Sequence, residues 1–321
     1  MPASASILIC TCNRSSALRQ TLESLRKVRV PAGLKAEVIV VDNASTDDTA
    51  AVVRSVTFPN MAARYVYEGK RGKSNALNTG LAVAQGEIIL FTDDDVFIPE
   101  DWLEQMVACF GNEQCDAIVG KITLAPELQR PWLSERQKLW LACVDFQSNG
   151  SMALIGANMG FRRAVLERVP TYDPELGPGA LGLGEESLFG SQLVEAGFKI
   201  KFAPAAGVVH FPEKSRLKRS QWLDTARKKG RQEAYIQYHW EHADISAPRF
   251  KWLWYQIKLH TRRIFQTPLP LDSEGCPAWE MSYVTHIEMC KQFLVESRRV
   301  RNYSKRGLLK RNLKAQDNSA N

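Results

Sequence analysis

Short apolar runs alternate with amphipathic segments over the first 125 residues of the chain. The apolar runs predict buried strands at 6–11, 37–41, 64–67 and 87–91. Between the first two, residues 17–27 place leucines at helical spacing, which predicts a helix. Because the strands alternate with helices and are apolar on both faces, we expect a mainly parallel sheet covered by helices on both sides.

Polar residues follow these strands at the point where each one ends. Thr11-Cys-Asn-Arg14 follows the first strand, Asp42 ends the second, and Asp93-Asp94-Asp95 follows the fourth. The carboxyl ends of parallel strands lie at one edge of a sheet, and open α/β sheets bind ligands there. We therefore expect these side chains to share one site.

Three adjacent aspartates repel one another and are costly to fold unless a cation compensates their charge. In an extended segment Asp93 and Asp95 point to the same side of the chain and Asp94 points to the other. Two hard oxygen ligands suit Mg²⁺ or Mn²⁺ held largely through a substrate's phosphates. A solvated acidic turn is the alternative, but the position of the triplet beside other polar strand ends favours a metal site.

Asp42 occupies the place where a carboxylate binds ribose in dinucleotide-binding folds, although a turn or helix-cap role is the alternative. Two missing motifs narrow the class of enzyme. No GxGxxG follows the first strand, which argues against an NAD enzyme, and the chain has no GxxxxGK[ST] of a P-loop ATPase.

Strand patterns stop after Phe211, and helices are expected from there on. We expect an α/β domain over 1–212, a helical basic extension over 213–303 and a flexible basic tail over 304–321. The net charge of +7 is uneven, because residues 211–321 carry +11 and the remainder −4. Such a basic part suits nucleic acid, an anionic membrane surface or simple solubility.

The segment 250–265 combines aromatic and basic residues on a predicted helix. Its apolar side chains share one face, which suits contact with a membrane interface or docking on the protein's own core. No apolar run approaches the roughly 20 residues of a membrane-spanning helix, and no signal peptide is evident. The seven cysteines form no CxxC pair, so we expect reduced thiols in the cytoplasm. Peripheral contact with the inner face of the membrane remains an open alternative to a purely cytoplasmic protein.

At these places the chain resembles family 2 of the inverting glycosyltransferases, which have the GT-A fold. The resemblance covers about residues 5–212, and its matching pieces are 9–14, 40–47, 72–78 with Gly80, 91–96, 156–163, 184–187 and 196–197. It implies a Rossmann-like, mixed but mainly parallel sheet flanked by helices, followed here by a C-terminal helical extension. The QxxRW motif and transmembrane helices of the processive synthases are missing, so the resemblance implies a non-processive enzyme.

The resemblance also implies roles for the matching residues. Those that would face the donor nucleotide or its phosphates are Thr11, Asn13, Arg14, Asp42, Lys73 and Asn78. Asp42 would hold the base, commonly uracil. Asp93 would contact ribose or metal-bound water, with Asp94 beside it on the donor side.

The metal, Mn²⁺ or Mg²⁺, would be bound by Asp95. His210 matches a position that binds metal or pyrophosphate in some members, with a surface histidine as the alternative. The family usually shows Glu-Asp in its later motif, with the Asp as catalytic base. Here the pair is Glu185-Glu186, so the role would fall on Glu186, whose side chain is one methylene longer. Its alternative role is to support the start of a helix.

We therefore expect a metal-dependent, inverting, hexosyltransferase-type enzyme of cell-surface polysaccharide or glycoconjugate biosynthesis. Its donor would be a nucleotide sugar, with UDP favoured, and its acceptor a saccharide or a lipid-linked molecule. A nucleotidyltransferase that makes sugar nucleotides is one alternative, but it needs a glycine-rich loop where residues 11–16 have none. A non-catalytic nucleic-acid-binding module is another, but the basic residues form no recognised motif, so no nucleic acid is expected.

Overall fold

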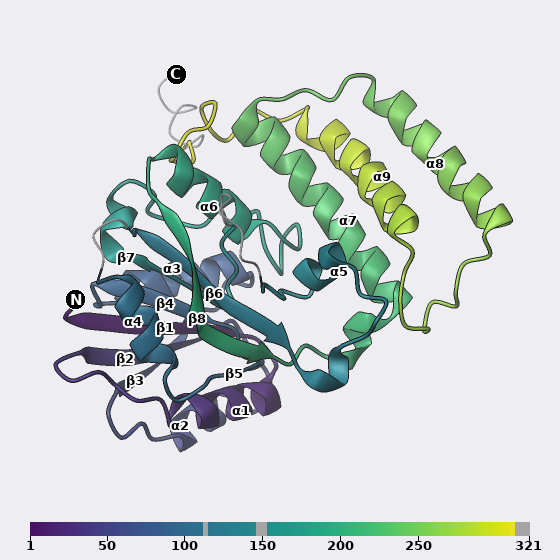
Figure 1. The fold of residues 1–321 in the computed structure, drawn as a ribbon. Coiled ribbons are helices and arrows are strands. Elements are labelled where there is room, and N and C mark those ends of the chain that lie inside the picture. The colour runs from purple at the N-terminus through teal and green to yellow at the C-terminus, as the bar shows by residue number, and fades with distance from the viewer. Residues whose placement is uncertain (112–114, 146–152, 312–321) are drawn as a thin grey trace. The chain divides into compact units, whose positions relative to one another are not determined.

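The computed structural model describes residues 1–111, 115–145 and 153–311. The chain forms two compact units. One contains Met1–Pro174 and Glu185–Pro212, and the other contains Glu175–Gly184 and the residues from Glu213 onward (Figure 1).

The first unit is built on a sheet that has eight strands in the described part of the chain. The strands are β1 (Ser4–Thr11), β2 (Lys35–Asp42), β3 (Ala62–Tyr67), β4 (Ile88–Thr92), β5 (Val96–Phe97), β6 (Ala117–Leu124), β7 (Asn158–Arg162) and β8 (Ile200–His210). Their order across the sheet is β3-β2-β1-β4-β7-β6-β8-β5, and β5 and β7 run against the others. The predicted mixed, mainly parallel sheet is confirmed.

Helices flank this sheet because its central strands are apolar on both faces. They are α1 (Ser15–Leu25), α2 (Thr49–Ser55), α3 (Lys73–Val83), α4 (Trp102–Cys109), α5 (Glu135–Trp140) and α6 (Glu185–Glu195), with short 3₁₀ turns at Pro126–Leu128 and Arg163–Glu167. Successive residues Ile7, Leu8 and Ile9 of β1 are all buried, although they alternate between the two faces. Leu18 and Leu22, whose spacing predicts α1, are fully buried on its inner face.

Strand register brings the polar strand ends together at one edge. Thr11 pairs with Asp42 across β1 and β2, and Thr92 of β4 pairs with Asn158 of β7. The short strand β5 follows the aspartate triplet and pairs with the end of β8, so that Val96 lies opposite His210. The expected meeting of β1, β2 and β4 at their carboxyl ends is therefore present.

The second unit is helical. It contains a 3₁₀ turn (Lys214–Leu217), α7 (Arg219–Ile236), a π-helical turn (Gln237–Glu241), α8 (Pro248–Phe265) and α9 (Ala278–Glu296). Helix α9 lies between α7 and α8 (Figure 1). A Cβ added at Gly230 of α7 would come 2.3 Å from the Thr285 carbonyl oxygen of α9, so the absence of a side chain there permits their close approach. The expected C-terminal helices are present.

The C-terminal residues are fixed by polar contacts within this unit. Glu175 accepts hydrogen bonds from Arg299, Asn302 and Lys310. Residues 304–311, assigned to the tail from the sequence, thus lie in the described structure, and the rest of the expected tail, 312–321, lies outside it. Among the described residues, every helix is too short or too polar to span a bilayer.

Candidate active site

A buried cluster of charges lies where β1 and β4 end. Arg14, at the entry to α1, donates from Nη1 to Asp94 Oδ1 at 2.8 Å and from Nη2 to Asp95 Oδ2 at 2.7 Å. The hydroxyl of Thr11 donates to the other oxygen of Asp94 at 2.7 Å. Burial, opposed by Arg14, raises the pKa of Asp94 to about 7. The Arg14 guanidinium, which bonds to both Asp94 and Asp95, thus compensates part of the repulsion among the three aspartates.

The orientation of the triplet differs from the extended-strand expectation. Strand β4 ends at Thr92, and the chain turns at Asp94 and Asp95. Asp94 and Asp95 therefore share Arg14, whereas Asp93 lies 3.2 Å from Lys73 Nζ. Side chains alternate between two faces only within a strand. The expectation that Asp93 and Asp95 point to the same side is therefore wrong, because these residues lie after the end of β4.

Asp95 forms a close pair with His210. His210 Nε2 lies 3.3 Å from Asp95 Oδ1, and both residues are buried, with 2% and 6% of their surface exposed. The other ring nitrogen, Nδ1, lies 2.8 Å from the Leu141 carbonyl oxygen. A carbonyl accepts only, so Nδ1 carries the proton and the Nε2 of a neutral imidazole presents its lone pair to a carboxylate. Two such acceptors face each other favourably only with a proton or a cation between them.

This geometry fits the metal expectation for Asp95 and His210. Metal-ligating histidines characteristically donate their second N–H to a carbonyl or carboxylate, which fixes the tautomer and the ring orientation. The alternative of a surface histidine is wrong, because His210 is buried. Within residues 1–111, 115–145 and 153–311, however, no three His, Cys, Asp or Glu side chains converge closely enough to hold a metal ion by themselves.

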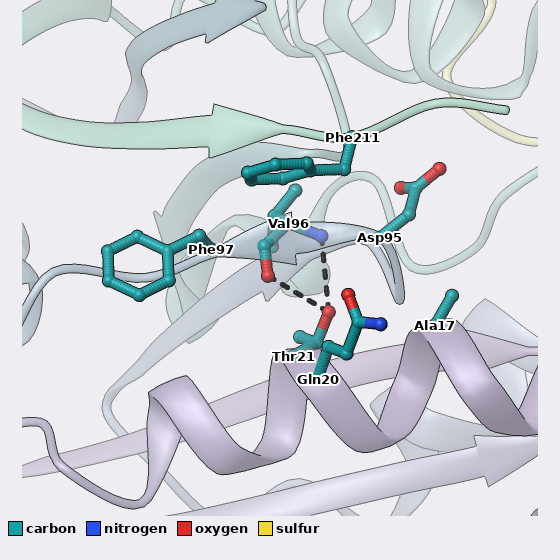
Figure 2. Close-up of a pocket in the computed structure, with 7 residues that line it drawn as sticks. All are labelled: Ala17, Gln20, Thr21, Asp95, Val96, Phe97 and Phe211. Carbon is teal, nitrogen blue, oxygen red and sulfur yellow. Dashed lines mark hydrogen bonds between the residues drawn. The ribbon is translucent and has the colours of Figure 1, made fainter. Parts of the chain in front are cut away.

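The backbone around Asp95 is held from two sides. The Phe211 N–H donates to the Asp95 carbonyl at 2.8 Å. On α1, the Thr21 hydroxyl donates to the Val96 carbonyl and accepts from the Val96 N–H (Figure 2). A pocket of about 120 Å³ lies beside these residues. Figure 2 shows that the Asp95 carboxylate points away from the end of the pocket where Phe97 lies. The pocket is lined by Ala17, Gln20, Thr21, Asp95, Val96, Phe97 and Phe211.

A second cluster joins the start of α3 to the start of α6. Lys73 Nζ lies 2.9 Å from Glu186 Oε1, 3.7 Å from Glu185 Oε1 and 3.2 Å from Asp93 Oδ1. Burial opposes the charged ammonium, but Asp93 and Glu186 hold the pKa of Lys73 well above its ordinary value. Burial and the adjacent Glu186 raise the pKa of Glu185 to about 7. Lys73 thus links the triplet to the expected catalytic base.

Glu186 is also fixed by the backbone of Gly156. The Gly156 N–H donates to Glu186 Oε2 at 2.8 Å. A Cβ at position 156 would lie 2.1 Å from Glu186 Oε1 and 3.1 Å from Lys73 Nζ. The absence of a side chain at Gly156 is what leaves room for this carboxylate.

Asp42 and Asn13 lie at the neighbouring strand ends. Asp42 accepts hydrogen bonds from the Tyr65 hydroxyl at 2.7 Å and from the Ser45 N–H at 3.0 Å. Burial and Asp42 together raise the pKa of Tyr65 to about 12. Asn13, with φ of 53°, accepts from the Thr46 N–H and so links the two loops after β1 and β2. A carboxylate accepts about four hydrogen bonds, so Asp42 retains capacity for a ligand.

Asn78 has a different environment from the other expected donor-binding residues. Its side-chain amide donates to the Tyr172 carbonyl at 2.9 Å and accepts from the Tyr172 N–H at 2.8 Å. It therefore positions Tyr172, whose ring stacks on Phe189 with centroids 4.3 Å apart. Asn158, which the resemblance also includes, is fully buried and bonded to Trp102, Lys121 and Ala206, so it is a packing residue.

Sequence reasoning missed two groups near this site. The hydroxyl of Tyr172 is buried and has no hydrogen-bond partner among the described residues. The Leu141 carbonyl, which fixes the tautomer of His210, follows α5 and lies 69 residues away along the chain. Neither Tyr172 nor Leu141 belongs to a motif, so no local signal in the sequence marks them.

Comparison with known proteins identifies the family. The model of "Glycosyl transferase family 2" matches residues 6–169, about half of the chain. The chain belongs to glycosyl transferase family 2. The family resemblance read from the strand-end motifs is thereby confirmed.

Two curated proteins match part of the chain. The probable glycosyltransferase YdaM of Bacillus subtilis is 26% identical over 214 residues, which are 63% of this chain and 49% of YdaM. A poly-β-1,6-N-acetyl-D-glucosamine synthase of Staphylococcus epidermidis is 31% identical over 117 residues, 36% of this chain and 27% of that protein. The chain thus spans about half or less of the length of these relatives.

Solved glycosyltransferases share the fold. The mannosyltransferase PcManGT of Pyrobaculum calidifontis, solved with GDP-Man and Mn²⁺, superposes with a TM-score of 0.61 at 20% identity, covering 91% of this chain and 87% of that one. Residues 1–349 of Staphylococcus aureus TarS, solved with UDP, give a TM-score of 0.51 at 19% identity, covering 84% and 76%. The sheet and its helices are therefore those of a GT-A glycosyltransferase.

Proposed function

We propose that this family 2 glycosyltransferase moves a sugar from a nucleotide diphosphate to an acceptor hydroxyl with inversion. The observation that carries the proposal is the junction of two buried clusters at one sheet edge. Asp95 and His210 form one, Lys73 and Glu186 form the other, and the chain from Asp93 to Asp95 joins them. Family membership supports sugar transfer as the reaction.

Asp95 and His210 are the residues that would hold Mn²⁺ or Mg²⁺. The protonated Nδ1 of His210 leaves Nε2 facing Asp95, the arrangement expected of two ligands that share a cation. Two protein ligands leave several positions for a substrate's phosphates and for water, as is usual for such cations. When bound, the metal supplies Lewis-acid stabilisation of a diphosphate leaving group. Arg14 orients the Asp95 carboxylate from its other oxygen.

Glu186 is the proposed general base. Lys73 Nζ donates to Glu186 Oε1 and the Gly156 N–H donates to Oε2, so both oxygens of this carboxylate are held in place. The carboxylate removes the proton of the acceptor hydroxyl as the hydroxyl oxygen bonds to the anomeric carbon. The bond from that carbon to the diphosphate breaks on the opposite face. One displacement of this kind inverts the anomeric configuration.

The donor is proposed to be a UDP-sugar, with its base held at Asp42 beside Thr11 and Asn13. The acceptor is a saccharide or lipid-linked hydroxyl in cell-surface polysaccharide or glycoconjugate biosynthesis. The names of relatives support this class, since one is a polysaccharide synthase and TarS is a poly(ribitol-phosphate) β-N-acetylglucosaminyltransferase. We place the reaction in the cytoplasm, which agrees with seven free thiols.

The test combines donor screening with turnover. Nucleotide diphosphates are screened by thermal shift with and without Mn²⁺, and release of the diphosphate from the matching nucleotide sugar is then measured with saccharide acceptors. We expect Glu186→Gln to keep the thermal shift and lose turnover by about 10²-fold or more. Glu127→Gln, which changes an exposed glutamate of the same unit, is the matched control and should behave as the unmodified protein. Turnover retained in Glu186→Gln would move the base elsewhere.

A further inference from the structure

Helix α8 is attached to the helical unit by one face. Leu259 is buried, Tyr255 stacks on His286 with ring centroids 4.6 Å apart, and Arg263 pairs with Glu280 at 2.6 Å. These contacts lie on the side of α8 that faces α9. An amphipathic helix of a globular protein buries one face against its neighbours, and in α8 this face is the one that contacts α9.

The opposite face of α8 is apolar and exposed. Its large apolar residues, with their exposed fractions, are Phe250 (69%), Leu253 (51%), Trp254 (41%), Ile257 (57%), Ile264 (77%) and Phe265 (82%). At 3.6 residues per turn these six lie within a sector about 120° wide, which we call the outward stripe. A surface helix normally presents polar residues there. Thr261 is exposed in the same sector between Ile257 and Ile264, so the stripe is apolar except at this turn. Exposed large apolar side chains gathered on one helix face mark an interaction site.

Basic residues border the outward stripe on both sides. Helical spacing places Lys251 and Lys258 along one margin and Arg249 and His260 along the other. Lys258 Nζ lies 3.6 Å from the centre of the Trp254 ring. The helix from Pro248 to Phe265 contains no Asp or Glu. An apolar stripe between basic margins is complementary to acyl chains beneath anionic headgroups.

A groove within the helical unit lies beside the stripe. It has a volume of about 330 Å³, and its lining combines Ile257 and Phe265 with Lys258 and Arg262. Such a groove suits a phospholipid, because the apolar side chains can contact its acyl chain and the cationic side chains can bind its phosphate. A second copy of the chain fits less well, because two basic margins would be brought together.

We propose that the outward stripe of α8 lies in the interface of an anionic phospholipid bilayer, with the helix parallel to the membrane plane. In this proposal the contact is peripheral, because α8 lies along the membrane surface and does not cross it. Side chains such as Ile257 and Phe265 enter the boundary between headgroups and acyl chains, and Lys258 remains at the phosphates. The contact does not depend on the donor site, so it stands or fails separately from the proposed reaction.

The test is co-sedimentation with vesicles of phosphatidylcholine alone or with phosphatidylglycerol, at low and high salt. We expect the protein to pellet with the anionic vesicles at low salt and to be released by salt. The triple variant Phe250→Ser, Ile257→Ser and Ile264→Ser should lose at least tenfold in partition. A triple serine variant at Val295, Val300 and Leu309, equally exposed apolar positions of the same unit, is the matched control and should pellet like the unmodified protein.

A second variant keeps the proposal testable if the apolar triple variant misfolds. Arg249→Gln with Lys258→Gln should lower partition about 25-fold, because each basic residue near an anionic surface contributes about fivefold. Equal pelleting with neutral vesicles, or no pelleting with anionic ones, would overturn the proposal. Light scattering that shows a dimer abolished by the apolar triple variant, without vesicle binding, would assign the stripe to a second copy instead.

Discussion

Replacing Gly156 with alanine adds a methyl group where Glu186 leaves no room for it. The new Cβ would lie 2.1 Å from Glu186 Oε1 and 3.0 Å from its Cδ. Carbon and oxygen at van der Waals contact stand more than 3 Å apart, so the carboxylate must move by about 1 Å. The atoms that move are the end of a flexible side chain, so we expect the fold to tolerate the change.

The displaced Glu186 carboxylate should mainly affect kcat. A misplacement of about 1 Å in a reacting group costs on the order of 10²-fold in rate. The loss of one charge-assisted hydrogen bond, from the Gly156 N–H to Glu186, lowers the free energy of unfolding by about 1.5–3 kcal/mol at most. Gly156→Ala should therefore lower kcat about 100-fold, with a fall in Tm of no more than about 10 °C and little change in donor binding.

The assay measures kcat by release of the nucleotide diphosphate, Tm by thermal unfolding and donor affinity by titration. Gly190→Ala, on the same helix as Glu186, is the matched control, because its Cβ would meet Leu154 at an ordinary 3.4 Å. Alanine is also the better helix former there, so Tm should not fall. A kcat for Gly156→Ala within threefold of the unmodified protein would refute the placement of Glu186 as base.

Three further predictions follow from the same contacts. His210→Ala should keep the fold but lose at least tenfold in Mn²⁺ affinity in the presence of UDP, measured by titration; unchanged affinity would remove His210 from the metal site. Glu185→Gln should flatten the dependence of Tm on pH between about 4.5 and 7. The pKa of Glu185 is about 7 in the folded state and 4.5 in its ordinary state, so its contribution to the free energy of unfolding is full below pH 4.5 and is lost as the pH rises through 7. An unchanged slope of Tm against pH in Glu185→Gln would contradict this. Alkylation of the exposed Cys12 thiol, followed by peptide mass spectrometry, should slow when UDP is bound, whereas the rate at Cys109 stays constant; equal rates at Cys12 would place the nucleotide elsewhere.

The strand ends could be predicted because they depend on local pattern. Thr11, Asp42 and Asp95 each follow an apolar run, and parallel strands bring such ends to one edge of the sheet. The helical period also predicts which side chains of α1 are buried. Both inferences need only the spacing of apolar residues.

The pairing of the charges could not be predicted in the same way. Arg14 binds Asp94 and Asp95 because the chain turns after Thr92, and that turn depends on packing against α1 and β8. Lys73 and Glu186 are separated by 113 residues, so their contact depends on how α3 and α6 are placed on the sheet. Tertiary packing determines such contacts, and no local spacing indicates them.

The central claim is that Asp95, with His210, holds a divalent cation against the donor's diphosphate. Its most direct test is the stabilisation by UDP of the unmodified protein and of Asp95→Ala, each with and without Mn²⁺. At a UDP concentration 100 times Kd, binding should add about 2.7 kcal/mol to the free energy of unfolding of the unmodified protein when Mn²⁺ is present. We predict that Asp95→Ala loses the part that depends on Mn²⁺. An equal Mn²⁺-dependent gain in Asp95→Ala would contradict the account.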